Sequence, residues 1–315
     1  MPMATYTKVP ELSLKHYIEG SPEEKQNFNE QLFAGIKHYG FIILKDHPVS
    51  TDLLDTAYSQ LQKLYSLPTE TKMKYFLNNG GKRGYTPFGT EHAKNNKHPD
   101  LKEFWHVGRD LEPGHELYER YPKNIWPEEL QEFKSTFQEL YKRLEATSDI
   151  MLESLTYSLD LPKDYFKTMT QDGSTVLRLL HYPPIPEDAD PNCIRAAAHE
   201  DINLITILVA ATQTGLELLD RDGKWLPVET EKNNLIVDAG DMLSRITNEV
   251  IPSTTHRVVN PKGENTSRYS MPFFVHPHPE ANLTCLDSCK GEKALYEDIK
   301  AEEFLMQRLK EIGLT

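Results

Sequence analysis

The middle and end of the chain contain a succession of short apolar runs rich in β-branched and aromatic residues, and this pattern limits the possible folds more than any other feature. Gly, Asp and Pro separate the runs. They occupy residues 174–182, 203–210, 216–219, 225–228, 235–237, 256–259 and 268–275. Several short strands divided by turn residues are typical of an all-β sandwich or barrel. We therefore predict a sandwich or barrel for this half of the chain.

The first half of the chain has helical periodicity instead. Ser21 followed by Pro22 is a helix-start signal, and Gly40 ends the amphipathic pattern that follows. Further helices are predicted at 52–67, 127–161 and 300–312, and a short buried strand at 41–44. Because no low-complexity linker or internal repeat interrupts the chain, we expect the helices to pack directly on the β-rich half.

Composition excludes several classes of protein. Among 315 residues, 48 are acidic and 35 basic, giving a formal net charge of -13. Nucleic-acid backbones need a basic face, so this balance argues against such a partner. The three cysteines, Cys193, Cys285 and Cys289, are too few for a disulfide framework and lack the spacing of a zinc site. No signal peptide or membrane-spanning run is visible, so we expect a cytoplasmic protein without a membrane partner.

A histidine two residues before an acid is a weak signal that occurs three times, at His98, His199 and His278. The first lies in a polar loop and is interpreted as a solvated turn. The last lies in a proline-rich segment and is not interpreted as part of a site either. His199 and Asp201 directly precede an apolar run instead. Side chains two apart on an extended chain point to the same side, so both can bind one ion. With His256, at the start of another predicted strand, they form the ligand set of a 2-His-1-carboxylate iron site.

Downstream of these residues, Arg268 and Ser270 lie two apart on a predicted strand. An arginine that faces a protein interior is costly unless it is paired. Its planar guanidinium suits a carboxylate, and the serine hydroxyl adds a neutral donor. We therefore expect a bound anion here, such as a dicarboxylate co-substrate. A structural salt bridge to Asp or Glu is the alternative.

These residues and their flanking motifs resemble the isopenicillin N synthase-like family of Fe(II)/2-oxoglutarate-dependent dioxygenases, over roughly residues 7–310. The matching segments are YGFIIL with His47, GYTPFGTE at 84–91, DLKE at 100–103, RLLHYPP at 178–184, GKWLPV at 223–228, GDM at 240–242 and TTHRV at 254–258. The resemblance implies an α+β fold: a double-stranded β-helix, or jelly-roll, core flanked by helices. It further implies that Tyr182 contacts the co-substrate together with Arg268 and Ser270.

On this basis we divide the chain into four parts. They are an N-terminal dioxygenase region at 7–125, connecting helices at 126–170, the jelly-roll core at 171–280 and a closing segment at 281–315. Four positions depart from the family pattern: Pro48, Leu180, Glu200 and Asp238. None removes a metal ligand, although Leu180 replaces a frequent asparagine and weakens the transfer of co-substrate contacts.

The expected activity is oxidation of a small molecule, by hydroxylation or desaturation, coupled to oxidative decarboxylation of 2-oxoglutarate, with Fe(II) and O2. One rival is an oxidase of the same family in which Arg268 holds the substrate's own carboxylate. A non-catalytic ligand-binding jelly roll and a zinc hydrolase are less favoured. Tyr85, Phe88, Phe104 and Phe273 are candidates for the substrate side, although a place in the core is the simpler interpretation of each. The substrate and the oligomeric state cannot be determined from sequence.

Overall fold

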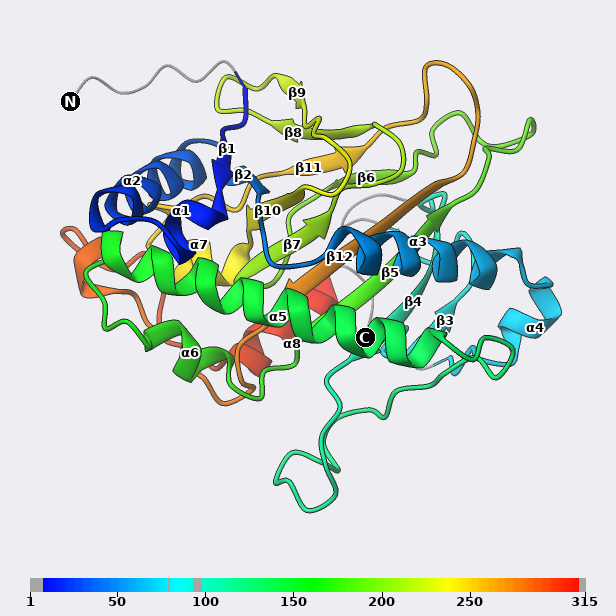
Figure 1. The fold of residues 1–315 in the computed structure, drawn as a ribbon, viewed down its shortest axis with the longest axis horizontal. Coiled ribbons are helices and arrows are strands. Elements are labelled where there is room, and N and C mark those ends of the chain that lie inside the picture. The colour runs from blue at the N-terminus through cyan, green and yellow to red at the C-terminus, as the bar shows by residue number, and fades with distance from the viewer. Residues whose placement is uncertain (1–7, 79, 93–97, 312–315) are drawn as a thin grey trace.

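A large, mostly antiparallel β-sheet forms the frame of the molecule (Figure 1). The computed structural model describes residues 8–78, 80–92 and 98–311. Within these ranges, eight strands pair in the order β1-β2-β10-β7-β12-β5-β4-β3. Their bounds are β1 Glu11–Ser13, β2 Phe41–Lys45, β3 Gly84–Thr86, β4 Glu103–Gly108, β5 Val176–Tyr182, β7 Ile205–Val209, β10 Leu235–Ala239 and β12 Arg268–Val275. Only the β1–β2 pair is parallel in this sheet.

A second, smaller sheet packs against the first. Its four strands, counted over the same described residues, pair in the order β6-β11-β8-β9. They are β6 Ala196–His199, β8 Leu216–Leu219, β9 Trp225–Pro227 and β11 His256–Val258. One apolar cluster contains residues from both sheets, among them Phe41, Leu208 and Ile236 from the large sheet and Leu218 and Val258 from the small one. The two sheets therefore enclose a common interior, which is the arrangement of a jelly roll.

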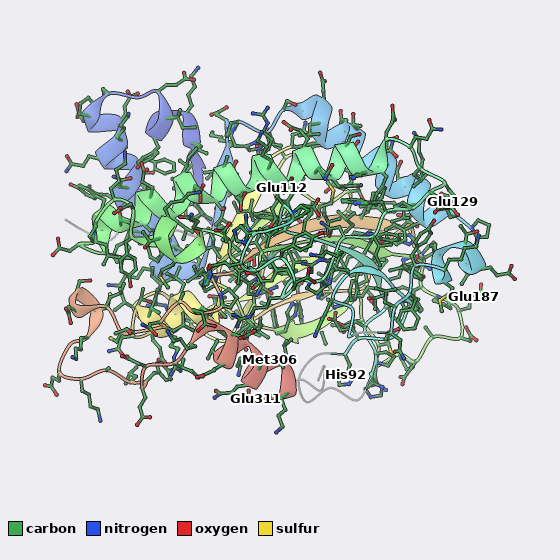
Figure 2. All side chains as sticks on the ribbon, turned by 90° about the horizontal axis from the view of Figure 1, so that it is seen from below. His92, Glu112, Glu129, Glu187, Met306 and Glu311 are labelled. Carbon is green, nitrogen blue, oxygen red and sulfur yellow. The ribbon has the colours of Figure 1, made fainter. Side chains whose placement is uncertain are left out.

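The outer face of the large sheet is covered by helices. Helix α5, Phe133–Ser158, runs along this face beside α2, Pro22–Tyr39, and α3, Thr51–Ser66 (Figures 1 and 2). The remaining helices are α1 Leu14–Ile18, α4 Thr69–Met73, α6 Tyr165–Thr170, α7 Asp241–Ile246 and α8 Ala301–Glu311, with a short 3-10 turn at Asp287–Cys289. In Figure 2, α8, marked by Met306 and Glu311, lies on the side of the strands opposite α5.

Local sequence signals explain how α2 begins and ends. Ser21 accepts a hydrogen bond from the Glu24 backbone, while the Glu24 side chain accepts one from the Ser21 backbone. This reciprocal capping box satisfies donors that the first turn leaves free. Gly40 ends the helix with a φ of 68°. A Cβ at this glycine would lie 2.1 Å from Thr254 Oγ1, just ahead of β11, so the position tolerates no side chain.

Most predicted elements are confirmed, with corrections. Each of the seven predicted β-rich runs contains a strand, and the helices at 22–39 and 52–67 correspond to α2 and α3. The helix predicted at 127–161 was wrong at its start, because α5 begins at Phe133. The closing helix is α8; residue 312 lies outside the described residues.

Strands β1, β3, β4 and β6 and the short helices α1, α4, α6 and α7 were not predicted. Strand β4 is buried along its whole length, so its sequence does not alternate between apolar and polar residues. No described helix has the length and apolar character needed to cross a membrane.

Candidate functional site

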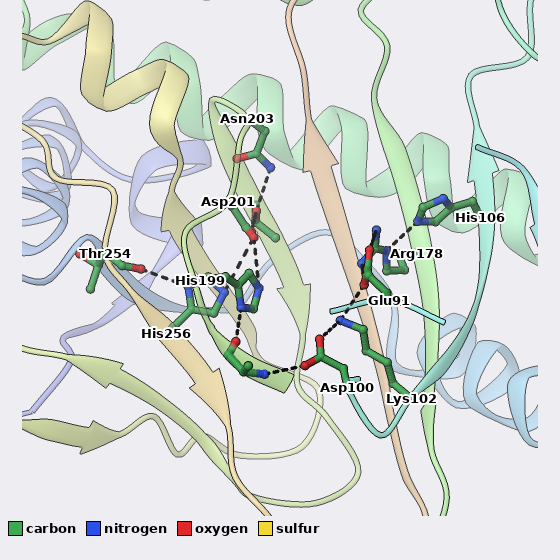
Figure 3. A network of polar contacts seen from close by, with 12 residues as sticks. Glu91, Asp100, Lys102, His106, Arg178, His199, Asp201, Asn203, Thr254 and His256 are labelled. Carbon is green, nitrogen blue, oxygen red and sulfur yellow. Dashed lines mark hydrogen bonds and ion pairs between the residues drawn. The ribbon is translucent and has the colours of Figure 1, made fainter. Parts of the chain in front are cut away.

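The structure brings His199, Asp201 and His256 together (Figure 3). His199 ends β6 and His256 begins β11, and the two lie opposite each other in the antiparallel ladder. Asp201 follows in the loop before β7. Its Oδ1 lies 3.8 Å from Nε2 of each histidine. The ligand atoms of all three residues lie within 4.8 Å of one another, which is compact enough for a single metal ion.

Hydrogen bonds orient each of these side chains. Nδ1 of His199 lies 2.7 Å from the carbonyl of Ala197, and Nδ1 of His256 lies 3.1 Å from that of Thr254. A carbonyl oxygen only accepts hydrogen bonds, so Nδ1 of each histidine must carry the proton. Nε2 of each ring is then unprotonated, and its lone pair is available to a metal ion. Thr206 in β7 donates to Oδ2 of Asp201. This leaves Oδ1 of the carboxylate directed at the two imidazoles.

Burial supports the neutral form of His199. Desolvation, and next the neighbouring His256, lower the pKa of His199 to about 4. A neutral imidazole is the form that binds a metal. The side chains of Asp201 and His256 are only 8% and 10% exposed, whereas that of His199 is 34% exposed. The cluster is therefore accessible on the His199 side.

The loop that carries Asp201 is fixed by the start of α7. Backbone N–H groups of Gly240, Asp241 and Met242 donate to the carbonyls of Leu204, Asp201 and Asn203, respectively, at 2.7–3.0 Å. A Cβ at Gly240 would lie 2.4 Å from the Asn203 carbonyl oxygen, so only glycine allows this approach. The GDM segment at 240–242 thus holds the loop between His199 and β7 in place.

Arg268 and Tyr182 lie opposite each other on β12 and β5, and Ser270 lies opposite Leu180. Tyr182 and Leu180 belong to the cluster between the sheets, so the two β12 residues face the same interior. Arg268 and Ser270 are each 2% exposed. Leu180 offers no polar contact at this place.

The guanidinium of Arg268 is incompletely paired. Its Nε donates to the Gln213 carbonyl at 3.1 Å, and its Cζ lies 5.0 Å from the Tyr182 ring. Its Nη1 is buried without a hydrogen-bond partner, and no carboxylate of the described residues lies within 4.0 Å of it. Burial lowers the pKa of Arg268, and Tyr182 and Tyr58 partly offset this. A pocket of ≈ 250 Å³, lined by Arg268, Leu208 and Ile236 among others, adjoins it. The structural salt bridge considered as an alternative is thus absent from the described residues.

A network of charged side chains connects β4 and β5 to the histidine cluster (Figure 3). Lys102 donates to Asp100 and Glu91, each at 2.7 Å, and Arg178 donates to Glu91 at 3.1 Å. The other oxygen of Asp100 accepts the backbone N–H of Ala197 at 2.9 Å. The carbonyl of Ala197 is the group that orients His199. The DLKE segment therefore supports β6, a role that sequence motifs alone did not reveal.

The four aromatic candidates for the substrate side lie in different parts of the molecule. Tyr85 is 2% exposed and donates to Glu103, and Phe273 is fully buried against Tyr141 of α5, so both belong to the core under the helices. Phe104 lies in the cluster between the sheets, and Phe88 is 40% exposed.

The two other His-x-acid pairs lie away from the cluster. His98 pairs with Asp190 at the surface, at 2.9 Å, and Nδ1 of His278 accepts the Glu280 N–H in a turn. The three cysteines form no disulfide.

Asp238, on β10, departs from the family pattern and was not proposed as a site residue. Burial and the nearby Asp201 hold the pKa of its carboxyl well above the usual range.

The fold and the cluster define the architecture of a non-haem iron oxygenase, and comparisons with known proteins agree. Residues 9–129 match the family described as the non-haem dioxygenase in morphine synthesis N-terminal region, and residues 173–277 match the 2OG-Fe(II) oxygenase superfamily. A crystal structure of a putative 2OG-Fe(II) oxygenase family protein from Caulobacter crescentus is 44% identical, with a TM-score of 0.88; the alignment covers 98% of this chain and 100% of that one.

Two fungal proteins are also similar. Neurospora crassa T7H, crystallised with alpha-KG and thymine, is 28% identical with a TM-score of 0.86, and 96% of each chain is covered. The 2-oxoglutarate-Fe(II) type oxidoreductase hxnY of Emericella nidulans is 29% identical over 95% of this chain and 88% of its own length. The chain belongs to the isopenicillin N synthase-like family of 2OG-Fe(II) oxygenases. It is an oxidoreductase that uses Fe(II), 2-oxoglutarate and O2.

Proposed function

We propose that His199, Asp201 and His256 bind Fe(II), and that Arg268, Ser270 and Tyr182 bind the far carboxylate of 2-oxoglutarate. The enzyme then couples decarboxylation of this co-substrate to oxidation of a small molecule. The observation that carries the proposal is the convergence of three donor atoms within 4.8 Å.

The side chains fit such an ion. Two imidazoles with free Nε2 atoms and one carboxylate oxygen form a set of three ligands on one side of a metal, and leave the other side open. Bound iron supplies the redox chemistry that amino-acid side chains lack. The protein contributes orientation: the carbonyls of Ala197 and Thr254 fix both rings, and Thr206 fixes the carboxylate.

The residues at Arg268 fit a carboxylate. An anion there would satisfy the free Nη1 and would offset the cost of the buried charge. Tyr182 lies opposite Arg268 in the strand ladder and Ser270 lies two residues further along β12, so their hydroxyls are neutral donors that we propose contact the same anion. Since Arg268 and Ser270 are buried, a charge-assisted hydrogen bond is stronger here than at the surface.

The exposed side of His199 is the direction from which we propose that the small-molecule substrate approaches. Neurospora crassa T7H has been crystallised with thymine and with 5-formyluracil, so a relative with the same fold accepts compounds of this size. We propose hydroxylation or desaturation of a small organic molecule as the reaction.

Metal content and succinate formation test this assignment. His199→Ala and Asp201→Ala are expected to abolish both stoichiometric Fe(II) binding and 2-oxoglutarate-dependent succinate formation in anaerobically purified protein. His278→Ala is the matched control, because it removes a histidine from another His-x-acid pair that lies in a surface turn. Undiminished iron content and succinate formation in the His199 variant would contradict the proposal.

A further inference from the structure

Arg195, immediately before β6, is a buried arginine to which the proposed function gives no task. It is 2% exposed. Its Nη2 donates to the Thr266 carbonyl at 2.6 Å, and its Nε is buried without a partner. Among the described residues, no carboxylate lies within 4.0 Å of this guanidinium. Its charge is therefore desolvated with no opposite charge beside it.

Arg195 lies close to the proposed carboxylate site. The carbonyl that it contacts belongs to Thr266, two residues before Arg268 on the segment that leads into β12. Burial, and next the positive charge of Arg268, lower the pKa of Arg195, while Tyr182 opposes them. Tyr182 is the residue that lies opposite Arg268 in the strand ladder. The two guanidiniums and the phenol therefore share one region between the sheets.

Two like charges without a counter-charge in one desolvated region are unfavourable, because each lacks compensation and each repels the other. Other buried cations in this fold have a carboxylate as their counter-charge. Lys102 and Arg178 are each in contact with the Glu91 carboxylate. An anionic ligand is the group that would neutralise the region around Arg195 and Arg268.

We propose that Arg195 is a second cationic specificity residue for the co-substrate. Together with Arg268, its charge makes the enzyme select a 2-oxo acid that carries a second, far carboxylate. This rests on the proposed function, and it extends that function to a residue outside the Arg-x-Ser pair. The role is electrostatic, so it depends on the charge of Arg195 and not on its hydrogen bond to Thr266.

Calorimetric titration of the full-length, Mn(II)-loaded protein without O2 tests the proposal. The two ligands are 2-oxoglutarate and 2-oxopentanoate, which has a methyl group in place of the far carboxylate. The variant is Arg195→Gln, whose amide can still donate to the Thr266 carbonyl but carries no charge. Its preference for 2-oxoglutarate over 2-oxopentanoate is expected to fall by about tenfold or more, with 2-oxopentanoate affinity nearly unchanged.

Two further variants complete the design. Arg195→Lys retains the charge and is expected to keep most of the preference. Arg257→Met is the matched control, since this arginine is paired with Glu217 and lies on β11. An unchanged preference in Arg195→Gln, or equal weakening of both ligands, would overturn the proposal and leave Arg195 a structural role only. Failure of the unaltered protein to bind either 2-oxo acid would contradict the proposed function itself.

Discussion

Two groups of buried cations lie near the interior between the sheets, and they differ in whether they have counter-charges. In the paired group, Lys102 and Arg178 contact the carboxylates of Glu91 and Asp100. In the unpaired group, Arg195 and Arg268 contact backbone carbonyls and leave nitrogens without partners. The charges of the paired group are compensated by carboxylates of the chain itself. The unpaired group lacks a counter-charge within the described residues, which is why we propose that it binds an anion, whereas the paired group supports the fold.

The largest expected effect is the loss of a cation from the paired group. Lys102→Met leaves Asp100 and Glu91 buried with one counter-charge fewer, so it should lower the free energy of unfolding by about 3–5 kcal/mol. Denaturant titration of the variant measures this. Lys167→Met is the control, because its ion pair with Asp149 is exposed and should cost about 0–1 kcal/mol. Equal effects of the two substitutions would break the distinction between the groups.

Removal of a cation from the unpaired group should not lower the free energy of unfolding, but should weaken ligand binding. Arg268→Met is expected to leave the stability of the ligand-free protein unchanged or raised, because it removes a desolvated charge that has no counter-charge among the described residues. It should weaken 2-oxoglutarate binding by about 2–4 kcal/mol, or roughly 30- to 1000-fold. Denaturation without ligand and titration with ligand measure the two effects. A strongly destabilised ligand-free variant would show that a counter-charge within the chain had been overlooked.

The connection between the paired group and the proposed metal ligands predicts a smaller effect. Asp100 accepts the Ala197 N–H, and the carbonyl of the same residue orients His199. Asp100→Ala should therefore weaken Fe(II) or Mn(II) binding by about 10- to 100-fold, as is usual for groups that orient a ligand. Asp100→Asn, which keeps an acceptor oxygen, should recover most of this affinity. Metal affinity unaffected by the alanine substitution would separate the network from the metal site.

The smallest expected effect concerns pH. Burial, and next Arg178, hold the pKa of His106 well below its usual value. The unfolded chain therefore binds a proton at this histidine near pH 6.5 that the folded chain does not bind, so stability is present above this pH and is lost as the pH falls. His106 should therefore contribute a loss of stability as the pH falls from 7 to 5. Denaturation of His106→Asn at both values should show a correspondingly smaller pH dependence; an identical one would contradict this.

Most of the proposed metal and co-substrate residues follow from a local rule, whereas His256 was proposed from its predicted strand and Tyr182 from the family resemblance. His199 and Asp201 are two apart on an extended segment, as are Arg268 and Ser270, and such spacing determines which side chains share a face. The jelly roll followed from turn-separated strands together with the family resemblance. The strand ladders then place His256 opposite His199 and Arg268 opposite Tyr182.

Other features depend on contacts between distant segments, and no local pattern reports them. Arg195 does not belong to a recognisable sequence motif. We propose a role for it because it is buried near Arg268, which lies 73 positions later in the chain. The support of His199 by Asp100 likewise connects segments 97 residues apart, through Ala197. The start of α5 was predicted too early because residues 127–132 form turns and coil, and not a helix.

The central claim is that one ion is bound by His199, Asp201 and His256 beside a 2-oxoglutarate site at Arg268. Anaerobic titration of the Fe(II)-loaded protein with 2-oxoglutarate, followed by visible absorption, tests it most directly. A weak chelate band should grow to one equivalent in the unaltered protein, require much more ligand in Arg268→Met, and be absent in Asp201→Ala. A band of full intensity in the Asp201 variant, or none in the unaltered protein, would contradict the account.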